Sequence, residues 1–232
     1  MPNRLRSFML SLLTFYGACA FAGSPTVFQD ALTQPDLNPT WQAINGDWQP
    51  SQHGLQGQGN DDWAVLLARQ TLPGNYTLTF ATLIDPQAYL LEVMLNVKRG
   101  KFVGLLYNQL DKTLAVEDRS LFDDPKANHG YIRTTGHVGQ LPKVDLSPKP
   151  EWVHWRIQKT GKALYVWLND QPMLAYTDQA SILKAGGGFG FAINGQARIK
   201  NLSLHRDQGD TALAPSPFHP PPRQRPFFLF SE

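Results

Sequence analysis

Residues 152–207 read WVHWRIQKTGKALYVWLNDQPMLAYTDQASILKAGGGFGFAINGQARIKNLSLHRD, and this stretch decides the fold. Short segments of alternating apolar and polar residues are separated by dipeptides such as Thr160-Gly161, Asn169-Asp170 and Asn194-Gly195. Glycine and asparagine accept the positive φ angles of tight hairpin turns. The pattern therefore predicts antiparallel strands joined by short turns, and it contains no motif of a known reaction.

The rest of the chain repeats this pattern. Tyr76–Ala81 alternates aromatic or aliphatic residues with threonine, and Ala88–Val97 is a longer run with its apolar residues on one face. Strand candidates recur every 8–12 residues or so, about a dozen in all. A single sheet would leave one apolar face in water, so we expect an all-β sandwich of two antiparallel sheets. Phe122–His129 and the proline-rich Leu141–Pro150 are expected to be loops.

Composition narrows the range of functions. The chain has 232 residues, 42% of them hydrophobic, and a formal net charge of +2. This content is sufficient for a core, whereas the scattered lysines and arginines give no electrostatic footprint for nucleic acid. After the first residues no apolar stretch is long enough to cross a bilayer, so we expect no membrane helix in the mature protein.

Residues 1–22 have the pattern of a secretory signal peptide. Two arginines precede an apolar segment that ends in Ala20-Phe21-Ala22, which is an A-x-A cleavage site. We therefore expect a periplasmic or secreted protein that begins at Gly23. The alternative is a lipoprotein signal that ends at Gly17-Ala18-Cys19, in which case Cys19 would be lipid-anchored.

The composition changes near the C-terminus. Residues 23–207 are predicted to form the domain, and 208–232 form a tail rich in proline and phenylalanine. Proline-rich segments favour extended conformations and cannot continue a sheet. The tail is therefore either a loose terminus or a docking peptide for a protein partner, through its last aromatic residues.

A family resemblance rests on motifs spread over nearly the whole domain. In chain order they are Phe28-Gln29-Asp30, Trp41, Gly46-Asp47-Trp48, Gly54-Leu55, Trp152–Ile157, Gly161, Leu168–Pro172, Gly188–Phe191 and Arg198–Leu204. Together they resemble concanavalin A-like and laminin G-like jelly rolls, and most closely the bacterial domain named for 3-keto-disaccharide hydrolase. The resemblance implies two curved sheets, with a concave face that binds sugars in many relatives.

The chain departs from that family where the pocket would lie. Relatives carry an Asn-Ser-Gly-Ile-type strand and an acidic, aromatic partner strand, whereas this chain has Leu91–Val97 and Gly104–Asn108. Glu92 and Tyr107 on these segments are candidate ligand-binding residues, but no catalytic residue can be transferred. The Glu-x-Asp-x-x-Glu motif of jelly-roll glucanases is absent, and the adjacent Glu117 and Asp118 would point to opposite faces of a strand.

Two segments suggest a polar groove. His154 and Arg156 fall on one face of the strand Trp152–Gln158, and Tyr131, Arg133 and His137 repeat the pattern on another segment. If these strands are neighbours, their side chains would form hydrogen bonds with sugar hydroxyls or carboxylates. The alternative is an ordinary outward polar face, which is common in antiparallel sheets.

Aromatic residues add to the carbohydrate signal, because sugars stack on aromatic rings. Trp63 and Trp167 are the tryptophans that we expect to be exposed, and Trp63 is a candidate ligand residue. We expect Trp41, Trp48 and Trp155 to lie in the core.

No cofactor is predicted by a motif. The histidines lack zinc-binding spacing, and no G-x-S-x-G occurs. Asn60-Asp61-Asp62 is either a structural calcium site or an acidic turn. The sequence thus favours an exported carbohydrate-binding jelly roll that recognises a glycan on a concave sheet face. The alternatives are a glycoside-processing hydrolase or lyase, and an envelope structural or protein-interaction domain.

Overall fold

The computed structural model describes residues 25–37, 39–86, 88–110, 112–124, 129–143, 151–178, 181–183 and 186–207, and for 60–62 and 122–143 it describes the backbone alone. The expected signal peptide, Cys19 and the tail 208–232 lie outside these residues. The regular elements within them are all β-strands, and they include no helix of the length and hydropathy that crossing a membrane requires.

The strands, in chain order, are β1 (Thr26–Asp30), β2 (Trp41–Asn45), β3 (Asp47–Ser51), β4 (Gly54–Ala68), β5 (Tyr76–Ile84), β6 (Leu90–Lys98), β7 (Lys101–Asn108), β8 (Thr113–Asp124), β9 (His129–Lys143), β10 (Val153–Thr160), β11 (Ala163–Leu168), β12 (Gln171–Thr177) and β13 (Gly188–Arg206). Most strand predictions are confirmed, but Phe122–Asp124 and Leu141–Lys143 are strand rather than loop. The proline at 142 is accommodated because β9 pairs only with β8 and the register shifts there.

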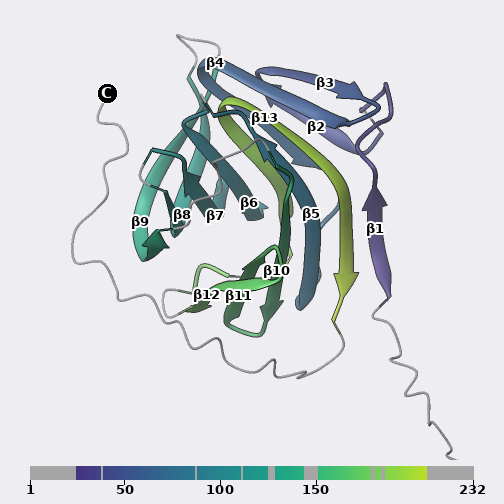
Figure 1. Ribbon diagram of the computed structural model, residues 1–232. Coiled ribbons are helices and arrows are strands. Elements are labelled where there is room, and N and C mark those ends of the chain that lie inside the picture. Colours follow the sequence, from purple (N-terminus) through teal and green to yellow (C-terminus); the bar gives the residue numbers. More distant parts are fainter. Residues whose placement is uncertain are drawn as a thin grey trace, which may run out of the picture.

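Every paired strand is antiparallel, and the long strand β13 belongs to two layers (Figure 1). Its first part, Gly188–Asn194, pairs with β6, and the chain of pairs continues through β7 and β8 to β9. Its second part, Ala197–Arg206, pairs with β5, and pairing continues through β10 and β11 to β12. We call these the first layer and the second layer. β4 lies along the other side of β13, with β2 and β3 beyond it, and β1 pairs near the end of β13.

A glycine marks the point where β13 passes from one layer to the other. Gly195 has φ 97°, a conformation that L residues with side chains rarely adopt. A Cβ there would lie 2.6 Å from the Cα of Ala88, and the register with β4 shifts between Ile193 and Gly195. This bend lets one strand serve both layers.

The main hydrophobic core fills the space between the two layers. Trp41 and Trp155 are buried in it, as predicted, and Trp48 packs partly buried at its edge. Phe80 stacks on Trp155 with ring centroids 5.6 Å apart, and Phe191 meets Phe80 edge-on at 5.1 Å. Buried indole groups need hydrogen-bond partners, and Trp155 donates to the Thr82 hydroxyl at 2.8 Å. The core therefore fixes both layers through aromatic contacts.

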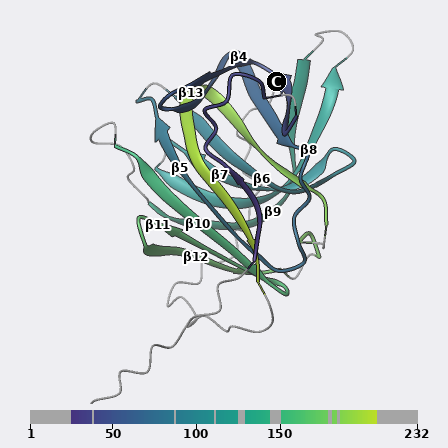
Figure 2. The same ribbon diagram turned by 90° about the vertical axis from the view of Figure 1, so that its right-hand side faces the viewer.

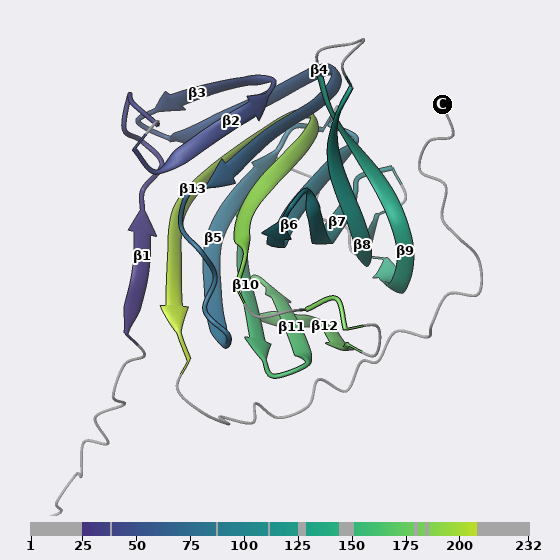
Figure 3. The same cartoon turned by 180° about the vertical axis from the view of Figure 1, so that it is seen from behind.

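A second buried cluster lies on the opposite face of the first layer. It contains Trp63, Val65, Leu90, Met94, Phe102, Leu106 and Ala192. This face is covered because the layer curls: β9, at its far end, returns to lie near β4 and β2, and it also approaches β12 (Figure 3). We call this covered surface the curled face.

Candidate functional site

The structure distributes the eight candidate ligand residues over several strands. Trp63 lies on β4, Glu92 on β6 and Tyr107 on β7; Tyr131, Arg133 and His137 lie on β9, and His154 and Arg156 lie on β10. β9 pairs with β8, whereas β10 pairs with β5 and β11. The two strands are therefore not neighbours, so the condition for a shared groove between them is not met, because each belongs to a different layer.

The three candidates on β9 are placed by backbone register alone. His137 is opposite Glu117, Arg133 is opposite Ser120, and Tyr131 is opposite Phe122. Their side chains lie outside the described part of the structure. Their predicted role in ligand binding stays a prediction.

The candidates on β4, β6 and β7 are buried. Tyr107 has no exposed surface and packs in the main core between the layers. Trp63 is 7% exposed and belongs to the second cluster, so it presents no open ring to a sugar. Glu92 is fully buried on the curled face.

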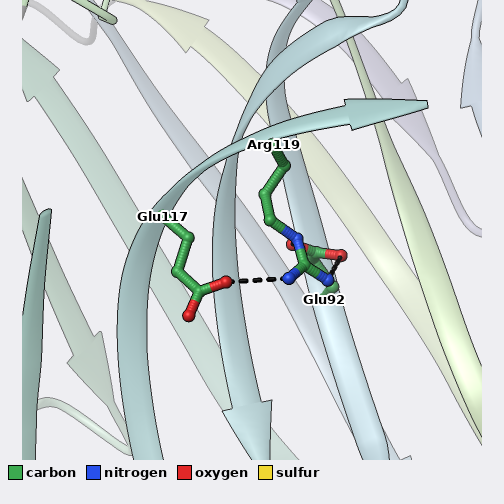
Figure 4. A network of polar contacts seen from close by, with 3 residues as sticks. All are labelled: Glu92, Glu117 and Arg119. Carbon is green, nitrogen blue, oxygen red and sulfur yellow. Dashed lines mark hydrogen bonds and ion pairs between the residues drawn. The ribbon is translucent and has the colours of Figure 1, made fainter. Parts of the chain in front are cut away.

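Glu92 belongs to a buried ionic network with two residues of β8 (Figure 4). The Nε of Arg119 lies 3.0 Å from Oε1 of Glu92, and its second terminal nitrogen lies 3.3 Å from Oε2. The other terminal nitrogen donates to Oε2 of Glu117 at 2.8 Å. Gly104, on the strand between them, leaves room for this network, since a Cβ there would collide with the Glu92 carboxylate and lie 2.9 Å from Cγ of Arg119.

The electrostatics of this network follow from its charges. Two carboxylates share one guanidinium away from water, so full ionisation would leave a net negative charge in the interior. Burial raises the pKa of Glu92 to about 7; Arg119 acts to lower it and Glu117 adds to the increase. A carboxyl group with such a pKa has the acidity of a general acid. However, both acids are at most 1% exposed and both are held by Arg119, so the described geometry is that of a structural ion network.

Sequence reasoning noticed Glu117 but missed Arg119. The signal was the alternation of the two residues on β8, which places both side chains on one face. The partner on β6 could not be found, because the register between the strands is set by the tertiary fold.

An exposed surface with a different composition covers the outward side of the second layer. Figure 2 shows β5, β10, β11 and β12 running side by side in this layer. His154 is exposed and Arg156 is half-buried, as the alternation predicted, with Val153, Trp155 and Ile157 facing the core. We call this surface the basic-aromatic face, and its residues are Trp152, His154, Arg156, Trp167, Arg198 and Lys200.

Strand pairing brings these residues together. Arg156 is opposite Trp167 on β11 and Thr79 on β5. Ala81 on β5 is opposite both His154 and Lys200, so it lies between these two cationic or protonatable residues. The face therefore combines residues from the beginning and from the end of the segment 152–207.

Two of the cations lie over tryptophan rings. The guanidinium carbon of Arg156 is 4.1 Å from the ring centroid of Trp167, and Nζ of Lys200 is 3.7 Å from that of Trp152. Tyr165 is next to Trp167, with centroids 6.0 Å apart. Such cation–π contacts restrict long side chains and orient their donors. The face thus presents partly exposed aromatic rings beside fixed cationic groups.

A shallow depression of about 140 Å³ adjoins this face at the end of β5. Arg198 belongs to both, and it donates from Nε to the Gln56 side chain at 3.3 Å. Leu83, Asp85, Pro86 and Gln196 are among the other residues that line the depression. His154 and Arg156 are therefore on an outward sheet face that continues into a depression.

Sequence reasoning missed Trp152, Arg198 and Lys200. Their segments are far apart in the chain and become neighbours only because β5 lies between β13 and β10. No local pattern reports this. Trp167, which was expected to be exposed, is half-buried, with one ring face under Arg156.

Residues 60–62 lie within β4, so the acidic turn expected there is wrong. Their side chains are outside the described part, and the calcium site stays a prediction. Elsewhere in the described residues, no three His, Cys, Asp or Glu side chains are grouped as metal ligands would be.

Known structures share this architecture. A protein of unknown function with a galectin-like fold from Bacillus subtilis matches with a TM-score of 0.61 and 15% identity, over 79% of this chain and 97% of that one. The carbohydrate binding module CBM66 from Bacillus subtilis matches with a TM-score of 0.57 and 15% identity, over 72% and 95%. SCLam, a non-specific endo-β-1,3(4)-glucanase from family GH16, matches with a TM-score of 0.56 and 6% identity, over 81% and 92%.

These similarities establish the fold: the chain is an all-β jelly roll of the concanavalin A-like and galectin-like kind, as the resemblance implied. No family model matches the chain, and no curated protein matches it. The closer resemblance to the 3-keto-disaccharide hydrolase-type domain stays a prediction.

Proposed function

We propose that this protein is a carbohydrate-binding domain whose ligand lies on the basic-aromatic face. The observation that carries the proposal is the pair formed by Arg156 and Trp167, in which a guanidinium lies 4.1 Å above a half-exposed indole ring. The indole offers an apolar surface for the C–H face of a sugar, and the guanidinium offers donors for its oxygens. This combination suits a saccharide better than a purely apolar or a purely charged ligand.

The burial pattern favours this face over the curled face. Trp63, Glu92 and Glu117 have almost no exposed surface, whereas Trp152, Arg156 and Trp167 are all partly exposed. A ligand could reach the first set only after the first layer opened. The concave-face binding that the family resemblance implied is therefore replaced here by binding on the outward side of the second layer.

A glycoside-processing enzyme is the second candidate function. The raised pKa of Glu92 and the nearby Glu117 favour it, because glycosidases use a pair of carboxyl groups. Such a pair must flank a substrate and admit water, whereas Arg119 occupies the space between these two acids. We therefore expect no turnover of disaccharides or 3-keto-disaccharides by the folded protein. Hydrolysis that is lost in Glu92→Gln would favour the enzyme instead.

A glycan array followed by calorimetry tests the binding function. We expect saccharide binding by the wild type and a loss of about tenfold or more in Arg156→Ala or Trp167→Ala, because a charge-assisted hydrogen bond or a stacking surface is removed. Lys101→Ala is the matched control, since Lys101 is an exposed cation on the first layer. Trp167→Phe should restore part of the affinity. Equal affinity in all four variants would refute the proposed face, and no glycan binding at all would favour a structural or protein-interaction role.

Export is part of the same proposal. The A-x-A site before Gly23 supports a secreted or periplasmic protein, and Cys19 offers lipid anchoring as the alternative. Mass spectrometry of the protein recovered from its native host distinguishes them. A mature chain that begins at Gly23 supports the soluble form, a diacylglyceryl-modified Cys19 supports the anchored form, and an intact N-terminus excludes both.

A further inference from the structure

We infer that the ligand of the basic-aromatic face is an anionic polysaccharide, with carboxylate or sulfate groups along its chain. This inference rests on the proposed function and specifies its substrate class. It starts from the charges on the outward side of the second layer. The ionisable nitrogen side chains there are those of His154, Arg156, Arg198, Lys200 and His205.

In the described part of the second layer, no acidic side chain shares the outward side with Arg156, Arg198 and Lys200. The outward positions of β5, β10, β11 and the second part of β13, all of them described, include no aspartate or glutamate. Nearby acids lie at the borders of the face, and they include the exposed Glu151 before Trp152 and the exposed Asp170 in the turn between β11 and β12. Asp207 accepts hydrogen bonds from Thr77 and Gln158, each at 2.9 Å, and Asp85 lines the depression beyond Arg198. Arg156 and Lys200 therefore have no acidic side chain among the outward positions of these strands.

The basic side chains and His154 are arranged across neighbouring strands. Lys200 and His154 are separated by the single strand β5, and Arg156 follows one pair further along β10. Adjacent strands are about 4.8 Å apart, so the backbones of Lys200 and His154 are roughly 10 Å apart. An extended chain that crosses the strands would meet two cation–tryptophan pairs, Lys200 with Trp152 and Arg156 with Trp167. This alternation matches a polymer that carries an acidic group on its successive sugars.

The side chains of Arg156 and Lys200 are also positioned to contact anions. The guanidinium carbon of Arg156 lies 4.1 Å from the ring centroid of Trp167, and its terminal N–H groups are suited to a carboxylate or a sulfate. Lys200 is held over Trp152 in the same way. A neutral glycan would use the rings but would leave these cations without a counter-charge. A nucleic acid or a polyphosphate would use the cations without needing the stacked geometry of both rings.

Paired ligands test the inference with the full mature chain. One pair is oligogalacturonate and its carboxyl-reduced counterpart, and the other is a sulfated galactan and its desulfated form. We expect at least one anionic member to bind about tenfold or more tightly than its neutral partner, because charge-assisted hydrogen bonds are lost in the latter. High salt should weaken the anionic complex strongly, since the contacts are exposed. Which pair shows the effect identifies the carboxylate or the sulfate.

Variants separate the possible results. Lys200→Ala and the charge reversal Lys200→Glu should weaken anion binding in that order, with Lys101→Ala as the unchanged control; thermal unfolding confirms that each is folded. If both members of each pair bind equally and Trp167→Ala abolishes both, the proposed function stands and the inference is wrong. If no saccharide binds, the proposed function fails as well. If single-stranded DNA or polyphosphate binds as tightly and Trp167→Ala has no effect, the face recognises charge alone and the inference is overturned.

Discussion

The guanidinium carbon of Arg156 lies over the ring of Trp167, 4.1 Å from its centroid, on two paired strands of the second layer. The relationship matters because each residue limits the motion of the other while both stay partly exposed. A ligand that binds there meets donors whose orientation is already fixed, and preorganisation of this kind lowers the entropic cost of binding.

The first prediction is that these two residues act as a unit in binding. In a double-mutant cycle measured by calorimetry, Arg156→Ala and Trp167→Ala should each weaken glycan binding, and the double variant should lose less than the sum. Without the ring, the guanidinium is no longer held in place and contributes less to binding, so Arg156→Ala costs less binding free energy in the Trp167→Ala background. We expect a coupling free energy of about 1 kcal/mol. Strictly additive losses would mean that the contact does not prepare Arg156 for the ligand.

The second prediction concerns Gly104, which faces the ionic network on the curled face. Gly104→Ala should lower the free energy of unfolding by about 1–3 kcal/mol, because the new methyl group displaces Glu92 and Arg119. Gly74→Ala is the control: a Cβ at Gly74 meets no atom within 4 Å, so we expect a change of at most about 0.5 kcal/mol. Denaturant unfolding measures the free energy of unfolding of both variants. Equal values would mean that Glu92 and Arg119 move aside for the new methyl group at little cost.

The third prediction concerns Arg119 itself. Arg119→Met leaves two buried carboxylates without their cation and should destabilise the fold by about 3–5 kcal/mol at neutral pH. The loss should be smaller at pH 5, where a proton can neutralise Glu92. Arg206→Met is the matched control, because it removes an arginine from an exposed position near the end of β13. A mild loss that does not vary with pH would contradict the buried network.

The fourth prediction is a pH dependence that originates from Glu92. Its pKa is about 7 in the folded protein and 4.5 when unperturbed, because burial disfavours the charged form. Between these values the folded state holds the proton and the unfolded state does not, so stability falls as pH rises. The whole effect is at most about 3 kcal/mol, since one pKa unit corresponds to about 1.36 kcal/mol.

Glu92→Gln isolates this contribution, because the variant keeps the shape and cannot titrate. The free energy of unfolding of the wild type should therefore decrease relative to the variant between about pH 4.5 and pH 7, and then level off. Chemical denaturation at several pH values gives the difference directly. A difference that stays constant, or that grows in favour of the wild type, would mean that Glu92 is ionised throughout.

The fold could be predicted from the sequence because its signals are local. Alternation along Val153–Thr160 separates core from surface, and the Asn169-Asp170 turn has the positive φ values that its residue types suggest. The turn predicted at Asn194-Gly195 is wrong: the positive φ of Gly195 makes a bend within the single strand β13. The extensions of β8 and β9 were missed because a proline argued against strand. Its effect is small at an edge strand, where fewer hydrogen bonds are required.

The candidate site was predicted only in part, because it depends on which strands become neighbours. His154 and Arg156 share an outward face, as alternation along one strand implies. The pairing of β10 with β5 and β11, rather than with β9, is decided by the packing of the two layers and has no sequence signal at this level. For the same reason Lys200 was overlooked, and the burial of Trp63 was not foreseen, since it follows from the curl of the first layer.

The most direct test uses the indole N–H signals of the six tryptophans in an NMR titration with oligogalacturonate or a sulfated galactan. Ligand on the basic-aromatic face should shift the signals of Trp152 and Trp167 and leave those of Trp41, Trp48 and Trp155, whose N–H groups are bonded to Asp30, Asn45 and Thr82. Single tryptophan-to-phenylalanine variants assign the signals. Shifts at Trp63 with none at Trp152 and Trp167 would place the ligand on the curled face and contradict the account.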